Sequence, residues 1–392
     1  MRSAQRVAIK GWAWRTPLGS SIENVTRKLL AGERAVRTNT RFDAASYLCT
    51  VASSIKEDPA VVRQRRFLRR MGLFALEVAR EALCHSGLLV GDRVGLFFGY
   101  GGLRAHWGDM MPAFEHQQSD GNGAWERGMN LLHPYWMLQH LSNNAHALAA
   151  EELRVRGEGA TFAGANAGAQ ALAAAIRALE AGAIDTALVV GYDSFIEPET
   201  LVDLAARGML TTQTENSVTA PYDRTAQGFV PGEAAASVVL QRVGSSDGRD
   251  LAYLQAADGA DGEAAAPRLS TITNLLANLT QGDTIIDGAG WAQPAQDNAE
   301  RIALAKFAGD DTMLCCTMSA LGQLGAAAPL VQAIALTEQL CLQMLAPIAG
   351  LQHAAAGLLR PLTSATPINT RSALAISMGT PGLAGAIRID VA

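Results

Sequence analysis

The stretch Pro221–Ala236, PYDRTAQGFVPGEAAA, stands near the middle of the chain, between two series of alternating strand and helix signals. The first series precedes it. The second follows a connection at 244–267 that is rich in Gly, Ala, Asp and Ser. Strands that alternate with helices in this way predict an α/β fold, in which helices cover buried sheets.

Hydrophobic periodicity, with Gly and Pro as punctuation, sets the boundaries of the predicted elements. In the first series the pattern predicts strands at Arg6–Trp14, Val94–Phe98, Ala160–Ala163 and Thr186–Val190, helices at Ile22–Leu30, Arg69–His85 and Ala167–Ala181, and a helix that ends within Glu151–Arg156. In the second it predicts strands at Thr284–Ile286, Met313–Thr317, Ala373–Ser377 and Gly385–Asp390, and helices at Ala295–Phe307 and Gly325–Leu345. The run YLQAAD at 253–258, inside the connection, is a further strand candidate.

The composition is that of a folded protein with a large core. Of the 392 residues, 49% are hydrophobic and 18% are charged, below the ~25% of charged residues in an average soluble protein. Intrinsic disorder is therefore excluded. The net charge is −5 and the chain has no long basic run, which argues against a nucleic-acid or anionic-membrane partner.

Two stretches without Asp, Glu, Lys or Arg, Thr312–Thr337 and Gln339–Leu359, are each long enough to span a bilayer. Glutamine and proline residues interrupt both of them, so we interpret them as a buried strand and buried helices. The N-terminal apolar run is too short for the core of a signal peptide, and Lys10 interrupts it. The sequence therefore predicts a cytoplasmic protein without a membrane span.

The five cysteines show neither C-x-x-C spacing nor a disulfide framework. Cys315 and Cys316 are adjacent in an apolar run, MLCCTM, and we interpret them as buried thiols. His133, His140 and His146 do not have the i, i+4 spacing of a zinc-binding pair. We expect neither a metal site nor a cofactor.

Several segments, in the right order, resemble the β-ketoacyl synthase family, whose members have the thiolase fold. The central stretch matches the family's P-[FY]-D segment and its G-F-x-x-G-E continuation at Pro221, Tyr222, Asp223, Gly228, Phe229, Gly232 and Glu233. Further similar segments are TPLG at 16–19, LLAGERAV at 29–36, RFDAASY at 41–47, RRMGLFALEVAREAL at 69–83 and the stretch at 133–161. The resemblance implies two similar βαβ-type halves, 1–245 and 246–392, that form a layered α-β-α-β-α sandwich.

The resemblance also implies a Cys-His-His site. In the family, a cysteine at a helix N-terminus takes an acyl chain from an acyl carrier protein, and two histidines help to decarboxylate the malonyl unit and stabilise its enolate. Here the alignment places Ala165 at the cysteine position, or Asn166 after a shift of one residue. Ala289 stands at the first histidine, and Gly322 or Gln323 at the second.

Two further family features have changed as well. Met318 replaces the lysine of the second histidine motif, and the closing glycine loop has become SMGTPGL at 377–383. The nucleophile, both histidines and the lysine are thus absent, while the structural glycines are kept. We predict that the chain has no catalytic residues and does not catalyse alone, although it belongs to a C–C-bond-forming 3-oxoacyl-ACP synthase complex.

Silent relatives in the family resemble chain-length factors, which pair with an active ketosynthase. The resemblance implies a heterodimer with such a subunit, and an acyl carrier protein with a phosphopantetheine-bound acyl chain as the second partner. Polyketide, polyene and fatty-acid-like elongation stay open, with polyene synthesis preferred. A stand-alone malonyl-thioester decarboxylase and a non-catalytic scaffold that binds acyl carrier protein are the alternatives.

Two groups of residues are candidates for these contacts. Bulky apolar side chains in two stretches are candidates for the acyl tunnel or the subunit interface, with ordinary packing as the alternative: Trp107, Met110, Met111, Phe114, Tyr135, Trp136 and Met137. A basic cluster in VVRQRRFLRRMG is a candidate docking site for the acidic carrier protein, with a solvated helix start as the alternative: Arg65, Arg66, Arg69 and Arg70.

Overall fold

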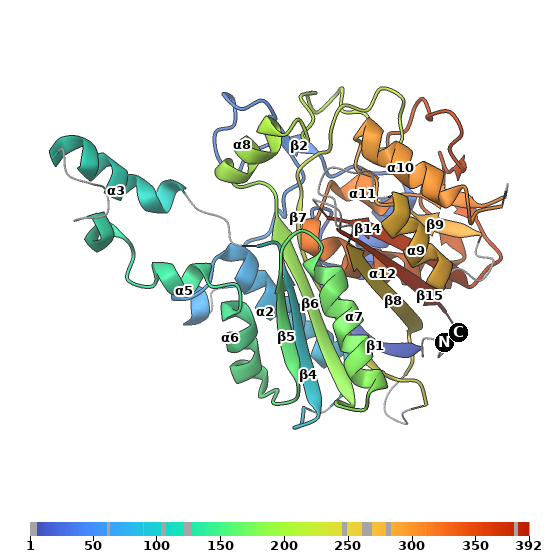
Figure 1. Ribbon diagram of the computed structural model, residues 1–392, viewed down its shortest axis with the longest axis horizontal. Coiled ribbons are helices and arrows are strands. Elements are labelled where there is room, and N and C mark those ends of the chain that lie inside the picture. Colours follow the sequence, from blue (N-terminus) through green and yellow to red (C-terminus); the bar gives the residue numbers. More distant parts are fainter. Residues whose placement is uncertain are drawn as a thin grey trace.

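A mixed β-sheet forms the centre of the molecule (Figure 1). The computed structural model describes residues 6–60, 63–88, 90–102, 107–120, 128–244, 249–260, 269–279, 284–309, 311–379 and 383–391. Among these residues, eleven strands follow the order β12-β10-β9-β14-β15-β8-β1-β7-β6-β4-β5.

The two parts of the chain build the two halves of this sheet. The N-terminal strands are β1 (Val7–Arg15), β4 (Val94–Tyr100), β5 (Gly159–Ala163), β6 (Thr186–Ser194) and β7 (Glu233–Arg242). The C-terminal strands are β8 (Ala252–Ala260), β9 (Ile285–Asp287), β10 (Met313–Cys315), β12 (Arg360–Pro361), β14 (Ser372–Met378) and β15 (Leu383–Asp390). The halves join where Val7–Ile9 of β1 pairs with Ala252–Leu254 of β8.

The helices lie in three layers around these strands (Figure 1). α7 (Ala167–Glu180) and α12 (Ala328–Leu342) lie between the two halves, because each contacts strands of both. α2 (Arg70–Ser86) and α6 (Asn144–Leu153) pack on the N-terminal strands, and α9 (Leu269–Leu279), with α10 (Pro294–Leu304) beside it, covers the C-terminal strands. The predicted α-β-α-β-α sandwich of the thiolase fold is confirmed.

The two central helices are mostly apolar, which suits their place between sheets. Ten of the 14 residues of α7 and twelve of the 15 of α12 are buried. Of the helices described, Gly325–Leu342 is long and apolar enough to cross a membrane, and 78% of this segment is buried within the fold. Such burial is typical of a core helix.

The remaining helices and strands complete the fold. The helices are α1 (Ile22–Leu30), α3 (Trp107–Asp120), α5 (Trp136–His140), α8 (Pro198–Ala206) and α11 (Thr317–Leu321), with 3-10 turns η1 (Arg63–Arg66), η2 (Gly128–Leu131) and η3 (Gly325–Ala327). The strands are β2 (Arg37–Thr38), β3 (Val51–Ala52), β11 (Met344–Leu345) and β13 (Thr366–Pro367).

Most predicted elements agree with the structure to within about one helical turn, and YLQAAD lies within β8. Two predictions were wrong in part: the strand from Met313 ends at Cys315, and the helix predicted at Gly325–Leu345 is η3 followed by α12 and β11. β7, α3, α5, α8, α9 and α11 were not predicted, and neither were the two-residue strands β2, β3, β11, β12 and β13. The boundary predicted between 245 and 246 lies outside the described residues.

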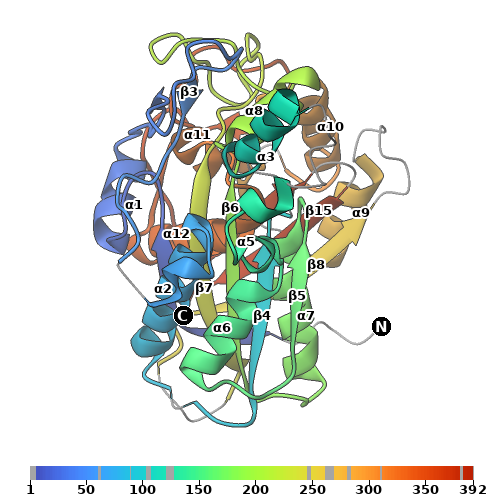
Figure 2. The same cartoon turned by 90° about the vertical axis from the view of Figure 1, so that its left-hand side faces the viewer.

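One segment stands away from the body of the fold. α3 and α5 project from the side of the N-terminal strands, and a quarter turn brings them to the front (Figures 1 and 2). We call residues 107–120 and 128–141 the arm. It follows β4 in the chain, and α6 leads from it to β5.

Candidate functional site

The cysteine position of the alignment lies where β5 gives way to α7. Ala165 is in the turn before the helix, and Asn166 is the N-cap residue. The buried Asn166 side chain makes no capping bond, and its Oδ1 accepts a hydrogen bond from the Ser377 hydroxyl at 3.4 Å. A Cβ at Gly379 would come within 2.5 Å of the Ala165 carbonyl carbon, so the loop after β14 closes on this turn. Neither a methyl group nor an amide is an acyl nucleophile.

Ala289, at the first histidine position, follows β9 in a tightly packed loop. Its N–H donates to Glu300 Oε1 at 2.8 Å, and the N–H of Gly290 donates to the Tyr222 hydroxyl at 2.9 Å. Gly290 has φ +55, and a Cβ there would collide with the sulfur of Cys316. The loop is therefore held by the side chains of Glu300 and Tyr222, which accept hydrogen bonds from its backbone, and it has no side-chain base at position 289.

Gln323, at the second histidine position, is hydrogen-bonded to the loop that contains Ala289. Its Nε2 donates to the carbonyl oxygens of Ala289 at 2.8 Å and Gly290 at 2.6 Å. An amide nitrogen has two N–H groups, and these two bonds use both. Gln323 therefore has no donor left for an enolate oxygen. Gly322, the alternative residue for this position, has φ +75 and contributes no side chain.

The space beside these residues is small. A cavity of about 20 Å³ is lined by Gly290, Met318, Gly322 and Gln323, among others. This volume suffices for about one water molecule. This cavity beside Gln323 is therefore too small to hold a thioester.

The polar residues of the central stretch serve the fold. Glu233 is buried and accepts hydrogen bonds from Arg70 Nη1 at 2.8 Å and from the N–H of Ile55 at 2.9 Å. Asp223 accepts bonds from the N–H groups of Gln352 and His353. Burial alone would raise the pKa of Asp223, but hydrogen bonds, first those from Thr225, outweigh burial and lower it below its ordinary value.

Two arginines of the basic cluster form ion pairs within the chain, and two are exposed to solvent. Arg70 points inward to Glu233, and Arg69 forms an ion pair with Asp109 of α3. Arg65 and Arg66 are exposed on η1, and the Arg66 guanidinium lies 4.7 Å from the centre of the Phe67 ring. The charges of Arg69 and Arg70 are thus engaged within the chain, which leaves Arg65 and Arg66 open to a docking protein.

Three buried carboxyl groups surround the Ala289 loop. Burial raises the pKa of Asp287 to about 6, that of Asp297 to about 7 and that of Glu300 to about 8, although hydrogen bonds to each carboxyl group partly offset this effect. In the described part of the chain, none of the three forms an ion pair with lysine or arginine. These groups therefore hold their protons at higher pH than exposed carboxyl groups do.

Burial also raises the pKa of Cys315 and Cys316 well above the ordinary range, so both are inert thiols in the core, as predicted. No group of three or more His, Cys, Asp or Glu side chains that could hold a metal ion occurs within the described ranges.

The first half of the chain matches the family model for "Beta-ketoacyl synthase, N-terminal domain" across residues 4–245, which is more than half of the sequence. The chain belongs to the β-ketoacyl synthase family. Among the curated relatives of this family member, 3-oxoacyl-(acyl-carrier-protein) synthase 2 of Coxiella burnetii is 25% identical over 331 residues, 78% of either chain. The protein of the same name from Vibrio cholerae is 23% identical over 385 residues, 91% of either chain.

Solved structures share the fold of this family member along its whole length. The structure described as the ishigamide ketosynthase/chain length factor has a TM-score of 0.86 at 21% identity, covering 99% of this chain and 100% of its own. A β-ketoacyl synthase from Burkholderia phymatum has a TM-score of 0.85 at 18% identity, with the same coverage.

The residues proposed for the acyl tunnel or interface lie on the arm of this β-ketoacyl synthase family member. Trp107, Met111, Phe114, Tyr135 and Met137 are 37–65% exposed, and Met110 and Trp136 are partly buried. None of the seven contacts the triad positions in any described interaction. The arm therefore presents apolar side chains that the other described residues leave exposed.

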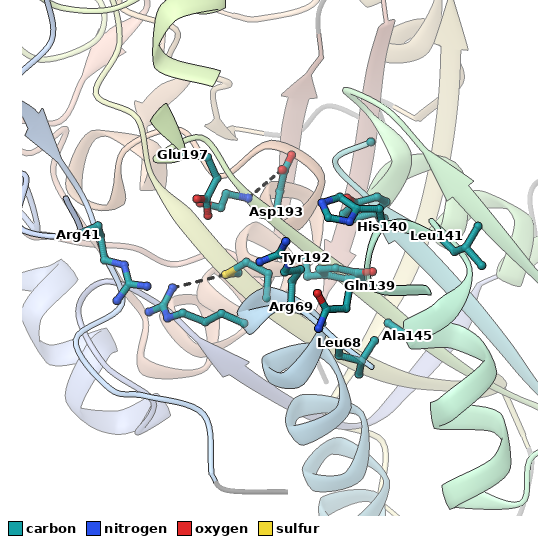
Figure 3. Close-up of a pocket in the computed structure, with 16 residues that line it drawn as sticks. Arg41, Leu68, Arg69, Gln139, His140, Leu141, Ala145, Tyr192, Asp193 and Glu197 are labelled. Atoms are coloured by element: carbon teal, nitrogen blue, oxygen red, sulfur yellow. Dashed lines mark hydrogen bonds between the residues drawn. The ribbon is translucent and has the colours of Figure 1, made fainter. Parts of the chain in front are cut away.

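A second, larger cavity lies beside the arm (Figure 3). Its volume is about 210 Å³, and it lies between the start of α2, the ends of β4 and β6, and α5. Arg69, Gln139, His140 and Tyr192 are among the residues that line it, whereas Ala165, Ala289 and Gln323 are not. Sequence analysis did not predict this cavity, because its walls come from segments that are far apart in the chain.

Replacing Glu300 by Gln will weaken the dependence of stability on pH. The folded state holds the Glu300 proton up to pH about 8, whereas an unfolded glutamic acid loses it near ~4.3. The unfolded state therefore binds fewer protons in this window, and folding stability falls as the pH rises through it. Urea unfolding at pH 5, 6.5 and 8 will show that the free energy of unfolding of the native chain falls as the pH rises. In Glu300→Gln this fall will be smaller by about 1 kcal/mol or more.

The control is Glu81→Gln, which neutralises a half-exposed carboxylate paired with Arg15. In this variant the free energy of unfolding should fall between pH 5 and pH 8 as much as it does in the native chain. Parallel curves for Glu300→Gln and the native chain would contradict the assignment of the buried proton.

Proposed function

We propose that the chain is a non-catalytic subunit of the chain-length-factor type. It pairs with an active β-ketoacyl-ACP synthase in the cytoplasm and shapes the acyl tunnel during type II polyketide, polyene or fatty-acid-like elongation. The acyl carrier protein delivers the growing chain to the partner's cysteine. The subunit contributes a wall of the tunnel and so limits the number of extensions.

The observation that carries this proposal is the state of Gln323. Both N–H groups of its amide are used by the carbonyls of Ala289 and Gly290. A decarboxylating or condensing site needs donors that point at the developing enolate oxygen. Such donors are absent from the described side chains at all three triad positions, which hold Ala165, Ala289 and Gln323.

The edge strand β5 supports pairing with another subunit. β5 is the last strand in the sheet order and pairs with β4 on one side. Its sequence, GATFA, has no charge and no proline, although edge strands of monomers are usually protected by such residues. An edge of this kind is suited to strand addition by a partner.

The exposed apolar surface of the arm supports the same conclusion. Contiguous exposed apolar groups on a folded protein mark interaction sites. The arm and β5 belong to the same side of the N-terminal strands (Figure 2), so one partner can cover both. The fold is also shared with a structure whose description names a chain length factor.

Co-expression tests the proposal. A tagged form of the chain should co-purify at one to one with an intact ketosynthase from the same genome, and the purified complex should condense malonyl-loaded carrier protein. The chain alone should neither condense nor decarboxylate. Turnover by the chain alone would favour the decarboxylase alternative, and binding of carrier protein without a ketosynthase would favour the scaffold.

A further inference from the structure

The first end of the arm is attached to the body by charged groups. The carboxylate of Asp109 in α3 pairs with the guanidinium of Arg69, which is the N-cap residue of α2. The backbone N–H of Trp107 donates to the carboxylate of Glu199 in α8. Both contacts lie within the first turn of α3, so they fix where this helix leaves the body.

The second end is attached through α5 and the residue before it. Gln139 Nε2 donates to the carbonyl of Arg66 at 3.0 Å. The Tyr135 ring packs edge-on against Phe67, with ring centres 5.0 Å apart. These contacts lie on η1 and the residue after it, just before Arg69 in the chain.

Both ends converge on the carboxylate of Asp109. His140 Nε2 of α5 lies 3.8 Å from the same Asp109 oxygen that pairs with Arg69. The side chains of Arg69 and Asp109 are 32% and 26% exposed, and that of His140 is 9% exposed. Burial lowers the pKa of His140, which favours its neutral form, so the ion pair is that of Arg69 and Asp109. This pair is partly shielded from water and interacts more strongly than a fully exposed pair.

We propose that Arg69 and Asp109 form a latch that holds the arm in its binding orientation before the partner subunit arrives. Arg69 is then a positioning residue for the interface, although its place in the sequence cluster suggested carrier-protein docking. The role of the arm in partner binding rests on the proposed function, but the latch itself does not. A segment ordered in advance loses less conformational entropy on association.

Amide hydrogen exchange tests the latch in the free chain. In Asp109→Asn, exchange in the peptide covering 107–120 should become about tenfold faster, because α3 loses its ion pair with Arg69. Peptides covering 136–141 keep the contact of Gln139 with Arg66 and should change less. Asp109→Glu keeps the charge and should restore slow exchange. Unchanged exchange in Asp109→Asn overturns the proposal.

The matched control is Asp258→Asn. Asp258 pairs with Arg177 at 3.1 Å, and its side chain is 26% exposed, like that of Asp109. The pair joins β8 to α7, which are not part of the arm. This variant should leave exchange in the arm at the native rate, so a general loss of stability can be told apart from release of the arm.

Binding to the active ketosynthase supplies the second measurement. Affinity should fall about tenfold in Asp109→Asn and stay native in Asp258→Asn, because a released arm must be ordered again on binding. If the native chain binds no ketosynthase, the proposed function fails, while the exchange experiment still decides the latch. Faster exchange with unchanged affinity overturns the role of the latch in association.

Discussion

Replacing the nucleophilic cysteine of the partner ketosynthase by alanine will lower condensation by the complex about a thousandfold or more. In contrast, Ala165→Gly and Asn166→Ala in this chain should change the rate less than about twofold. In the proposed heterodimer, the nucleophile and both histidines belong to the partner. The readout is mass spectrometry of acyl chains on the carrier protein, at equal amounts of purified complex.

A variant that restores a cysteine at position 165 provides the control for this prediction. Ala165→Cys places a thiol at the start of α7, where the helix dipole favours the thiolate. The variant should still not condense alone, because Ala289 offers no imidazole and the amide of Gln323 is already bonded. If the complex still condenses after the partner's cysteine is replaced, a residue of this chain supplies the nucleophile.

The layers of the fold could be predicted because they depend on local pattern. Helices such as Ile22–Leu30 show a clear apolar face, and the Ala-rich run of α7 is mostly apolar. The strand β7, EAAASVVLQR, was missed because it is buried along nine of its ten residues and shows no alternation. α3 and α5 were missed because their apolar residues face outward and do not follow the periodicity of a core helix.

That the triad positions hold no cysteine or histidine stays a prediction from the sequence, whereas the hydrogen bonds around these positions could not be predicted at all. The absence of cysteine and histidine follows from aligning short motifs. The bonds that close the site join residues far apart in sequence: Gln323 reaches Ala289 across 34 positions, and Arg70 reaches Glu233 across 163. No local pattern encodes such pairings. The same limit applies to Arg69, whose ion pair with Asp109 on the arm could not be read from the sequence.

Adding one methyl group at the start of α7, in Gly168→Ala, will destabilise the fold by about 3 kcal/mol or more. A Cβ at Gly168 would lie well under 3.0 Å from the carbonyl oxygen of Ala326 in η3, a distance that real Cβ atoms do not show. The backbone at Ala326 cannot easily move away, because its N–H donates to the buried carboxylate of Asp193 at 3.0 Å. The gain in helix propensity from glycine to alanine is at most ~1 kcal/mol and does not offset the collision.

Urea unfolding and the yield of folded protein measure this effect, with Gly91→Ala as the control. A Cβ at Gly91 meets no atom within 4 Å, so this variant should unfold within about 0.5 kcal/mol of the native chain. The contrast between the two variants tests the packing of α7 against η3. Ala165 lies just before α7 and Gln323 lies just before η3, so this packing sets how close the two triad positions lie. A native-like Gly168→Ala would mean that these two segments are farther apart, and the closed geometry of the triad positions would then be wrong.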